Sequence, residues 1–423
     1  MNHTSRFAIF AIIGLFALPL VSGQSLEFRE APEAFLPGIV DSNSPALWRN
    51  GRLQIYTSGG TPAVSFADGP EGPFETRSVG LDPDAHLPMW IESVWQDEDG
   101  TVFAWYHHER VGVCPGTRLT TPMIGALIST DGGLSFRDLG IVISSGEPVN
   151  CFAENGYFAN GHGDFTVVFD RAAGYFYFFF GAYAGQDGEQ GVATARMAYA
   201  DRFYPVGAVR KYYAGEWNEP ALGGRVSPIF PAVVGWDQAA TDSFWGPSVH
   251  WNTYLNKWVM LLNHACCQPD WPQDGIYISF GDDLSSPDTW SAPVQIIPSG
   301  DWYPQILGAE PGETDSVAGQ TVRFYTHGRS NLYIVFHLEG EDTQDPEAPP
   351  PPEDPEQPPP PEDPEQPPPP EDPGQPPPPQ NPNQPPPPHP PDDPGGSAHS
   401  IPPPAGEANA APARPGQRLR RRS

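Results

Sequence analysis

Residues 245–264 read "WGPSVHWNTYLNKWVMLLNH", and the fold prediction starts from this segment. Aromatic and aliphatic residues fill its two ends and a polar Asn and Lys mark its middle, so it predicts two strands around a turn. A Trp-Gly-Pro corner stands before the first strand. Proline is tolerated there, because the start of a strand needs no backbone donor for the sheet.

The same layout of corner, strand, turn and aromatic strand occurs in four other segments, residues 41–58, 90–109, 163–183 and 321–339. Repeats of roughly 55–65 residues with three to four strands each are typical of propeller blades. We therefore predict an all-β, five-bladed β-propeller over residues 31–340. A β-sandwich and an eight-stranded barrel are the alternatives, but neither requires the same unit five times.

The start of the chain predicts export. Arg6 precedes an apolar run over residues 7–21, and small residues follow, so residues 1–23 read as a cleaved signal peptide. A membrane anchor is the alternative, although the run is shorter than the roughly 20 residues that a bilayer core needs. We expect a secreted protein, extracellular or periplasmic, without a membrane span.

Residues 341–423 form a second compositional region. The unit "PPPPEDPEQ" repeats there, and runs of four prolines exclude both helix and sheet. The segment predicts a disordered, acidic, Pro-rich tail with extended polyproline-II character. Association with a cell wall or surface through this tail is one expectation, and a tail without a partner is the other.

The charge of the chain limits its partners. The net charge is −30, and 15 acids against 5 arginines from Glu341 onward give −10, which leaves −20 for residues 1–340. Such an acidic body repels nucleic acid and anionic membranes. Neutral carbohydrate remains as a partner.

Four cysteines in a chain expected to be exported favour disulfides. Of the three pairings that four cysteines allow, we favour Cys114–Cys151. The adjacent Cys266 and Cys267 are then either joined to each other or reduced. Zinc is a weaker alternative, because no CxxC or paired-histidine spacing accompanies them.

Several side chains are expected to meet at the propeller axis, where the innermost strands begin. These are Asp41, Glu92, Asp164 and Trp245, with His250 further along the same strand. Converging carboxylates repel each other, so the pKa of at least one rises. Glycoside hydrolysis uses such an arrangement. By contrast, "STDGGLSFRDLG", residues 129–140, resembles the Asp-box turn, so Asp131 is predicted to be structural.

Two of these residues carry a resemblance to a known group. Asp41 in "VDSNSP" and Asp164 in "GHGDFTVVFD" resemble the blade-one and blade-three aspartates of the five-bladed propeller glycosidases, which include arabinanases, xylosidases, levansucrases and invertases. The resemblance implies that Asp41 is the base or nucleophile. It implies that Asp164 is the auxiliary carboxylate, which tunes the acid or stabilises the transition state.

The chain departs from that group at the expected general acid. Arabinanase-like members often begin blade four with Glu-Gly-Pro, whereas this chain has Trp245 in place of the glutamate. The substitutes are Glu92, Glu219 in "GEWNEPALGG", and His250. The alternatives are that Glu219 is a loop residue and that His250 is a core histidine.

Residues of the kind that contact sugars surround these acids. Aromatic faces stack on sugar C–H groups and histidines bind hydroxyls. The predicted substrate-binding residues are Trp90, His107, His162, Trp245 and His250. Blade packing is the alternative role for each. The sequence contains no metal-chelating motif, so we predict no cofactor. A structural calcium ion at the axis is the alternative.

The sequence thus favours a secreted glycoside hydrolase that acts on a poly- or oligosaccharide through axial carboxylates. A non-catalytic carbohydrate-binding or surface-displayed propeller is the alternative. A protein-interaction scaffold and a lyase on uronic polymers are further alternatives, although an acidic body disfavours a polyanionic substrate.

Overall fold

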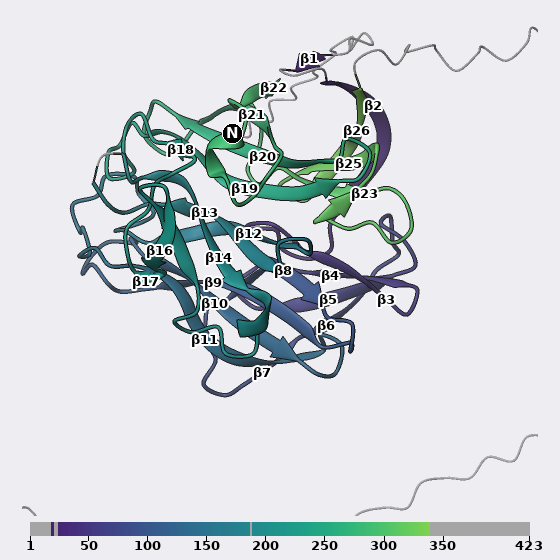
Figure 1. The fold of residues 1–423 in the computed structure, drawn as a ribbon, viewed down its shortest axis with the longest axis horizontal. Coiled ribbons are helices and arrows are strands. Elements are labelled where there is room, and N and C mark those ends of the chain that lie inside the picture. The colour runs from purple at the N-terminus through teal and green to yellow at the C-terminus, as the bar shows by residue number, and fades with distance from the viewer. Residues whose placement is uncertain (1–17, 21–23, 187, 339–423) are drawn as a thin grey trace, which may run out of the picture. The chain divides into compact units, whose positions relative to one another are not determined.

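The computed structural model describes residues 18–20, 24–186 and 188–338. These residues form five antiparallel sheets, each built mainly from strands that follow one another in sequence (Figure 1). From blade one to blade four, the innermost strand of each blade contacts the innermost strand of the next. The chain is therefore a five-bladed β-propeller, as predicted. The predicted Pro-rich tail and most of the predicted signal peptide lie outside the described residues.

Blades one and two follow the predicted repeat. Blade one runs outward through β3 (Ala46–Arg49), β4 (Arg52–Tyr56), β5 (Ala63–Ala67) and β6 (Glu75–Ser78). Blade two runs through β8 (Trp90–Gln96), β9 (Val102–Arg110), β10 (Thr121–Ser129) and β11 (Ser135–Ser145). Two short strands pair in parallel with β11, namely β7 (Gly80–Leu81) and β17 (Leu222–Gly223).

Blades three and four contain longer inner strands. Blade three has the order β12 (His162–Asp170), β13 (Tyr175–Ala182), β14 (Gly191–Ala198), β15 (Arg210–Tyr213) and β16 (Glu216–Pro220), with β18 (Phe230–Pro231) beside β14. Blade four has the order β19 (Asp242–Asn252), β20 (Lys257–Cys266), β21 (Gln273–Gly281) and β22 (Val294–Pro298), with β24 (Val317–Ala318) beside β19. Two short 3-10 helices complete the described elements, Tyr199–Asp201 and Pro287–Thr289.

Blade five is shared between the two ends of the described chain. Its strands are β23 (Gln305–Gly308), β25 (Thr321–Thr326), β26 (Arg329–Leu338), β2 (Gln24–Phe35) and β1 (Leu18–Leu20). The early strand β2 pairs along β26, from Gln24 opposite Leu338 to Phe35 opposite Arg329. This pairing closes the ring, and β2 begins before residue 31, the predicted start of the domain.

The fifth predicted segment, residues 321–339, differs from the other four. It forms the second and third strands of its blade, β25 and β26, whereas the innermost strand is β23. The strand β23 is separated from β25 by a long connection that contains β24, so no short hairpin marks it in the sequence.

The aromatic strand β13 shows how the blades are held together. Phe176, Phe178 and Phe180 pack into a cluster with blade-two residues, whereas Tyr177 and Phe179 pack into a cluster with blade-four residues. Alternate side chains of a strand point to opposite faces, so one strand fills both interfaces. Burial of each Phe side chain contributes about 1.5–3 kcal/mol to the free energy of folding.

The Asp-box turn in blade two is structural, as predicted. The Asp131 carboxylate accepts hydrogen bonds from the backbone N–H groups of Leu134 and Ser135, at 3.1 and 3.0 Å. Although burial raises the pKa of Asp131, these bonds and those of two serine hydroxyls outweigh it and lower the pKa to about 2. Among the residues that the structure describes, no helix is long and apolar enough to cross a membrane.

Candidate active site

Bulges in three inner strands set the geometry of the axis. The register shifts around Glu92 in β8, around Asp164 in β12, and between Trp245 and Ser248 in β19. An extra residue in a strand bends it and turns a side chain out of the regular alternation. Asp164 adopts a positive φ of 46° at its bulge.

The third bulge corrects the prediction for the Trp-Gly-Pro corner. The strand β19 begins at Asp242, so Pro247 lies inside it and not at its start. Pro247 is tolerated there because the bulge removes the need for a ladder hydrogen bond. The Pro247 carbonyl oxygen accepts two hydrogen bonds at the axis, from Asn43 Nδ2 at 3.1 Å and from Thr166 Oγ1 at 2.6 Å. These bonds join blades one, three and four.

A cavity of about 250 Å³ opens beside these bulges. Three carboxyl side chains line it, those of Asp41, Glu109 and Asp164. Two basic side chains, those of Arg118 and His107, also line the cavity. Much of the remaining wall is aromatic, with Trp90, Tyr157, Trp245, Trp271, Trp302 and Tyr303. The cavity therefore combines flat apolar faces with a small number of acids.

Asp41 is the exposed acid of the cavity. The Trp90 indole donates to Asp41 Oδ2 at 3.1 Å, and the Tyr303 hydroxyl donates to Asp41 Oδ1 at 3.4 Å. The Asp41 backbone N–H donates to Ser58 Oγ at 3.2 Å. The carboxylate is thus oriented on both oxygens and still faces solvent.

Asp164 is the buried acid of the cavity, with 5% of its surface exposed. The Tyr183 hydroxyl donates to Asp164 Oδ2. Burial raises the pKa of Asp164 to about 7, with a further rise from the charge of Glu92 and an opposing effect of His107. A carboxyl with this pKa carries a proton in a large fraction of molecules at neutral pH.

Glu92 and His107 set the electrostatic environment of Asp164. His107 Nδ1 lies 3.0 Å from Glu92 Oε1, and the Phe165 backbone N–H donates to Glu92 Oε2 at 2.7 Å. Burial lowers the pKa of His107, but its hydrogen bond to Glu92 and the charges of Glu92 and Asp164 outweigh burial and raise it to about 9. A cationic His107 therefore faces Asp164.

The sequence makes Glu92 a candidate proton donor, but the structure places its side chain outside the cavity. Its side chain is fully buried and does not line the cavity. Burial raises the pKa of Glu92, against the effect of His107. Glu92 holds His107 in position, and it has no surface through which it could reach a substrate.

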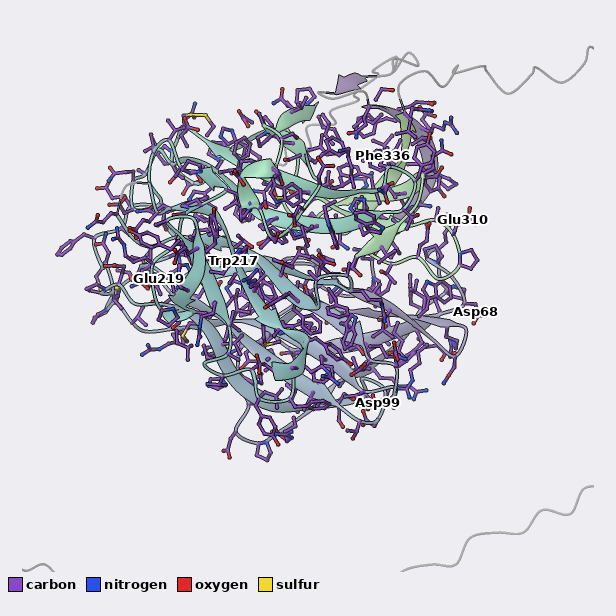
Figure 2. The ribbon with its side chains drawn as sticks, in the orientation of Figure 1. Asp68, Asp99, Trp217, Glu219, Glu310 and Phe336 are labelled. Carbon is purple, nitrogen blue, oxygen red and sulfur yellow. A yellow bond between two sulfur atoms is a disulfide. The ribbon has the colours of Figure 1, made fainter. Side chains whose placement is uncertain are left out.

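Glu219 also lies apart from the cavity. It belongs to the outermost strand of blade three, β16, and accepts the backbone N–H of Arg225 at 3.2 Å (Figure 2). The short alternation "EWNEP" forms this extra edge strand, so Glu219 is neither a cavity acid nor a loop residue.

Two of the predicted sugar-binding histidines lie in the interior. His162 is buried, with its Nε2 3.0 Å from Lys211 Nζ. His250 is 1% exposed, and neither ring nitrogen has a hydrogen-bond partner among the described residues. Burial lowers the pKa of His250 to about 3, so it is a neutral core residue. The other predicted binding residues, Trp90, His107 and Trp245, do line the cavity.

The predicted disulfide Cys114–Cys151 is present, with its Cα atoms 5.4 Å apart. It fixes the loop that brings Arg118 to the cavity. Cys266 and Cys267 are joined to each other, which was one of the two predicted states.

Other lining residues were not predicted from the sequence. Glu109 stands near the end of β9, where its Oε1 lies 3.8 Å from His107 Nε2. Trp302 and Tyr303 form the corner before β23, and Trp271 lies in the loop after Cys267. The signal that could have found Tyr303 is the Trp-Tyr-Pro corner, which resembles the Trp-Gly-Pro corner of blade four.

The donor atoms of Glu92, His107 and Asp164 lie within 4.8 Å of one another, which makes this cluster the candidate for a calcium ion at the axis. Calcium takes six to eight oxygen ligands. Here the third group is an imidazole whose Nδ1 faces Glu92, and both carboxylates already accept hydrogen bonds from the protein. The cluster does not fit calcium.

No protein-family profile and no curated protein matches the chain. Solved structures match at low similarity. A thermostable family-43 glycoside hydrolase is 14% identical, with 73% of this chain and 96% of that chain covered and a TM-score of 0.43. The endo-arabinase of Bacteroides thetaiotaomicron is 11% identical, with 73% and 97% covered and a TM-score of 0.42. The α-L-arabinanase of Cellvibrio cellulosa, complexed with arabinohexaose, is 13% identical, with 72% and 94% covered and a TM-score of 0.42.

These values carry no functional conclusion for this chain. Its own sheet order and hub cavity define the class, a five-bladed β-propeller with an acidic, aromatic-lined site at the axis.

Proposed function

We propose that this protein is a glycoside hydrolase that acts on a polysaccharide or an oligosaccharide. One observation carries the proposal. An exposed, oriented carboxylate and a buried carboxyl with a raised pKa face the same aromatic-lined cavity. Glycoside hydrolysis needs a pair of carboxyl groups in two different protonation states.

Asp41 is the base or nucleophile in this proposal. Its two oxygens accept hydrogen bonds from Trp90 and Tyr303, so the carboxylate is held toward the cavity. A carboxylate in this role either activates water or attacks the anomeric carbon, depending on its distance from the acid.

Asp164 is the proton donor. Its pKa of about 7 matches the requirement that a general acid titrates near the working pH. The resemblance implies only an auxiliary role for Asp164. We assign it the role of proton donor because Trp245 occupies the position of the expected glutamate and cannot donate a proton to a leaving group.

The aromatic wall supplies substrate binding. Trp90 and Trp302 are partly exposed in the cavity wall, and aromatic rings stack on the C–H faces of sugars. Trp245 and Trp271 are buried and shape the wall behind them. A volume of about 250 Å³ lies below the roughly 300–1,000 Å³ of common ligand pockets. We therefore expect a small sugar unit to occupy it.

The test is hydrolysis of a panel of neutral plant, algal and microbial glycans, followed as release of reducing ends. On the active substrate we expect Asp164→Asn to lower kcat about 10²–10⁴-fold, because general acid catalysis contributes that factor. Asp41→Asn should also abolish most turnover. Glu219→Gln is the matched control, because Glu219 lies on β16 outside the cavity, and it should retain full activity.

Unchanged turnover of Asp41→Asn would refute the proposal. Binding to glycans without release of reducing ends from the same ligands would instead identify a non-catalytic carbohydrate-binding propeller.

We also propose that the protein is exported. Two disulfides support this, because such bonds persist mainly in oxidising compartments. N-terminal sequencing of the protein recovered outside the cytoplasm should find a start near Gln24. Recovery of the intact amino terminus would contradict cleavage.

A further inference from the structure

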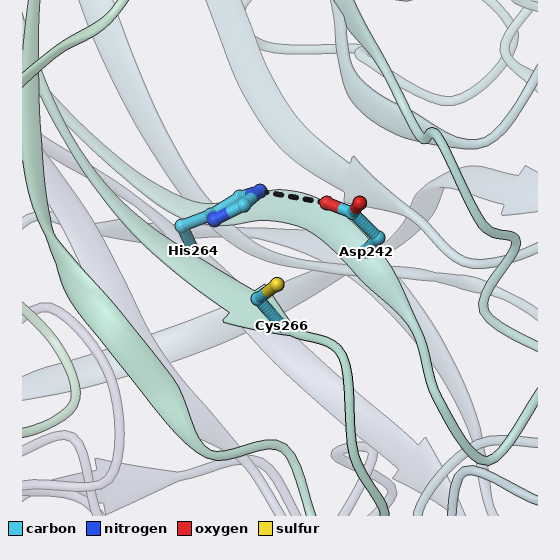
Figure 3. Close-up of side chains that lie close together, drawn as sticks. All are labelled: Asp242, His264 and Cys266. Atoms are coloured by element: carbon cyan, nitrogen blue, oxygen red, sulfur yellow. Dashed lines mark ion pairs between the residues drawn. The ribbon is translucent and has the colours of Figure 1, made fainter.

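A second cluster of potential metal ligands lies on blade four, on one face of the ladder between β19 and β20. Asp242 and Cys266 are opposite each other in this ladder, and His264 precedes Cys266 by two residues. Residues two apart on a strand share a face. The three side chains therefore converge, and their donor atoms lie within 4.8 Å of one another (Figure 3).

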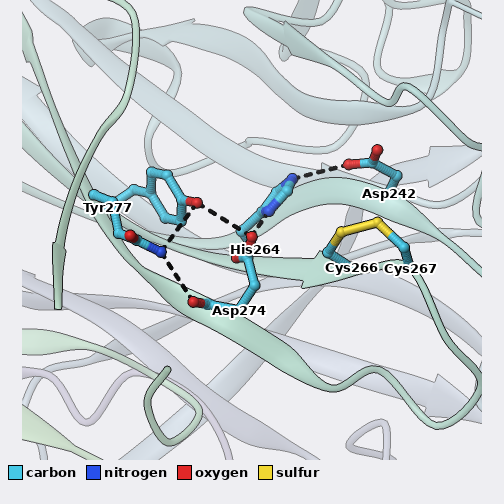
Figure 4. Close-up of a disulfide and its surroundings, with 7 residues drawn as sticks. Asp242, His264, Cys266, Cys267, Asp274 and Tyr277 are labelled. Atoms are coloured by element: carbon cyan, nitrogen blue, oxygen red, sulfur yellow. Dashed lines mark hydrogen bonds and ion pairs between the residues drawn. A yellow bond between two sulfur atoms is a disulfide. The ribbon is translucent and has the colours of Figure 1, made fainter. Parts of the chain in front are cut away.

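His264 is held between two carboxylates. Its Nε2 lies 3.1 Å from Asp242 Oδ1, and its Nδ1 lies 2.9 Å from Asp274 Oδ1 (Figure 4). Tyr277 donates to the other Asp274 oxygen at 3.3 Å, so Asp274 is itself anchored. A carboxylate on one imidazole nitrogen is the usual outer partner of a histidine that binds metal through the other nitrogen.

The third potential ligand is blocked in this structure. Cys266 Sγ is bonded to Cys267 Sγ, and a disulfide sulfur does not replace the thiolate that metals bind (Figure 4). Reduction would free Cys266 Sγ beside His264 and Asp242. The side chains are open to entry, since those of His264 and Asp242 are 13% and 24% exposed.

We propose that reduction of the Cys266–Cys267 disulfide creates a binding site for a zinc-like divalent cation. Asp242 oxygen, His264 Nε2 and Cys266 Sγ are the ligands, and Asp274 orients His264 from the opposite side. A mixed oxygen, nitrogen and sulfur set suits zinc and excludes calcium and magnesium. Three protein ligands leave the fourth tetrahedral position to water.

The distances fit such a site after small movements. Zinc ligands lie about 2.0–2.3 Å from the metal, so that ligands of one ion are within about 4 Å of one another. The present separations are below 4.8 Å. The cation would replace the proton that His264 Nε2 and Asp242 Oδ1 now share across 3.1 Å.

The chemical step balances with a dithiol or phosphine reductant. The reductant supplies two electrons, the sulfur–sulfur bond breaks, and Cys266 and Cys267 each gain a proton. Zinc then displaces the proton of the Cys266 thiol and the proton at His264 Nε2, and both are released to solvent. The site does not depend on the proposed hydrolase activity.

The first experiment titrates the full chain with Zn²⁺ or Co²⁺ alone, before and after treatment with a phosphine reductant. We expect about one ion per chain after reduction and a cobalt spectrum with a thiolate charge-transfer band, because the ligand set includes one Cys thiolate. The oxidised protein should lack that band. A reduced chain without it would overturn the proposal.

A pair of cysteine variants tests the site without a reductant and leaves the Cys114–Cys151 disulfide intact. Cys267→Ser frees the Cys266 thiol, so it should bind cobalt with the thiolate band under oxidising conditions. Cys266→Ser is the matched control, which frees the wrong thiol and should not show the band. Equal spectra for the two variants would refute the assignment.

Variants of the partner residues complete the test in the Cys267→Ser background. Asp274→Asn should weaken zinc binding about 10–100-fold, the usual effect of removing an outer partner of a ligating histidine. His264→Ala should remove binding. Near-ultraviolet circular dichroism of each variant separates loss of the site from loss of the fold, and normal affinity in a folded His264→Ala variant would contradict the proposal.

Discussion

Trp245 and Asp164 decide the chemistry at the scale of single residues. Trp245 is buried in the cavity wall, where its indole N–H donates to Gln273 Oε1 at 3.0 Å. It is a fixed wall residue in the place of the expected acid. Asp164 differs from an ordinary aspartate because it is buried beside a second carboxylate and a cationic histidine.

The pH profile should therefore report Asp164. A general acid with a pKa of about 7 loses its proton as the pH rises, so kcat/KM should fall above about pH 7. His107 lowers the pKa of Asp164. Removing an opposite charge at this range raises a carboxyl pKa by about 1–3 units, so His107→Gln should move the alkaline limb upward by that amount. Initial rates across the pH range measure it.

The control for this prediction is His337→Gln. His337 lies on β26 and pairs with Glu27 at 3.3 Å, so its loss should leave the alkaline limb in place. An alkaline limb that does not move in folded His107→Gln protein would mean that another group donates the proton.

At the scale of elements, the site depends on irregular features: the bulges of the inner strands and the loops that follow them. The Cys114–Cys151 disulfide joins the loop after β9, which carries Arg118 to the cavity, to the loop after β11. The bond joins residues 37 apart in sequence, and it therefore lowers the conformational entropy of the unfolded chain.

Replacing both Cys114 and Cys151 by serine should lower the free energy of unfolding by about 3–4 kcal/mol, the loop-closure value for this separation. Urea denaturation of the variant and the parent, without reductant, measures the difference. Reduction of the parent breaks both disulfides, so the reduced parent should lose at least as much stability as the variant. A loss below about 1 kcal/mol would mean that this loop is already ordered in the unfolded chain.

At the scale of the whole molecule, the ring is closed by the early strand β2 on the late strand β26. Leu26 of β2 is fully buried in a cluster that also contains Leu261 of blade four and Ile306 of blade five. The closure therefore contributes to the core and does more than complete a sheet edge (Figure 1).

Leu26→Ala should lower the free energy of unfolding by about 2–5 kcal/mol, because it leaves a cavity in a packed interface. Chemical denaturation followed by tryptophan fluorescence measures the loss. Glu30→Ala on the same strand is the matched control, since Glu30 is exposed, and it should change stability by less than about 0.5 kcal/mol. Equal stability of the two variants would place β2 outside the cooperative fold.

The hairpins of blades one to four were predictable because their aromatic and β-branched residues alternate around short turns, as in Trp90–Arg110. The inner strand of blade five was not, because a long connection that contains β24 separates β23 from β25. Asp41 and Asp164 were predictable because one lies shortly before an inner strand and the other near the beginning of one.

The repeat and the number of blades were readable from the sequence, since they follow from local alternation. The sequence also favoured the Cys114–Cys151 pairing, and the positions of Asp41 and Asp164 relative to the inner strands pointed to the axis. Tertiary structure alone decided that Glu92 is buried, that Glu219 lies on an outer strand, and that Glu109 and Tyr303 reach the cavity. The physical reason is that bulges and ring closure join residues far apart in sequence. Burial and neighbouring charge, which set each acid's protonation, exist only after that assembly.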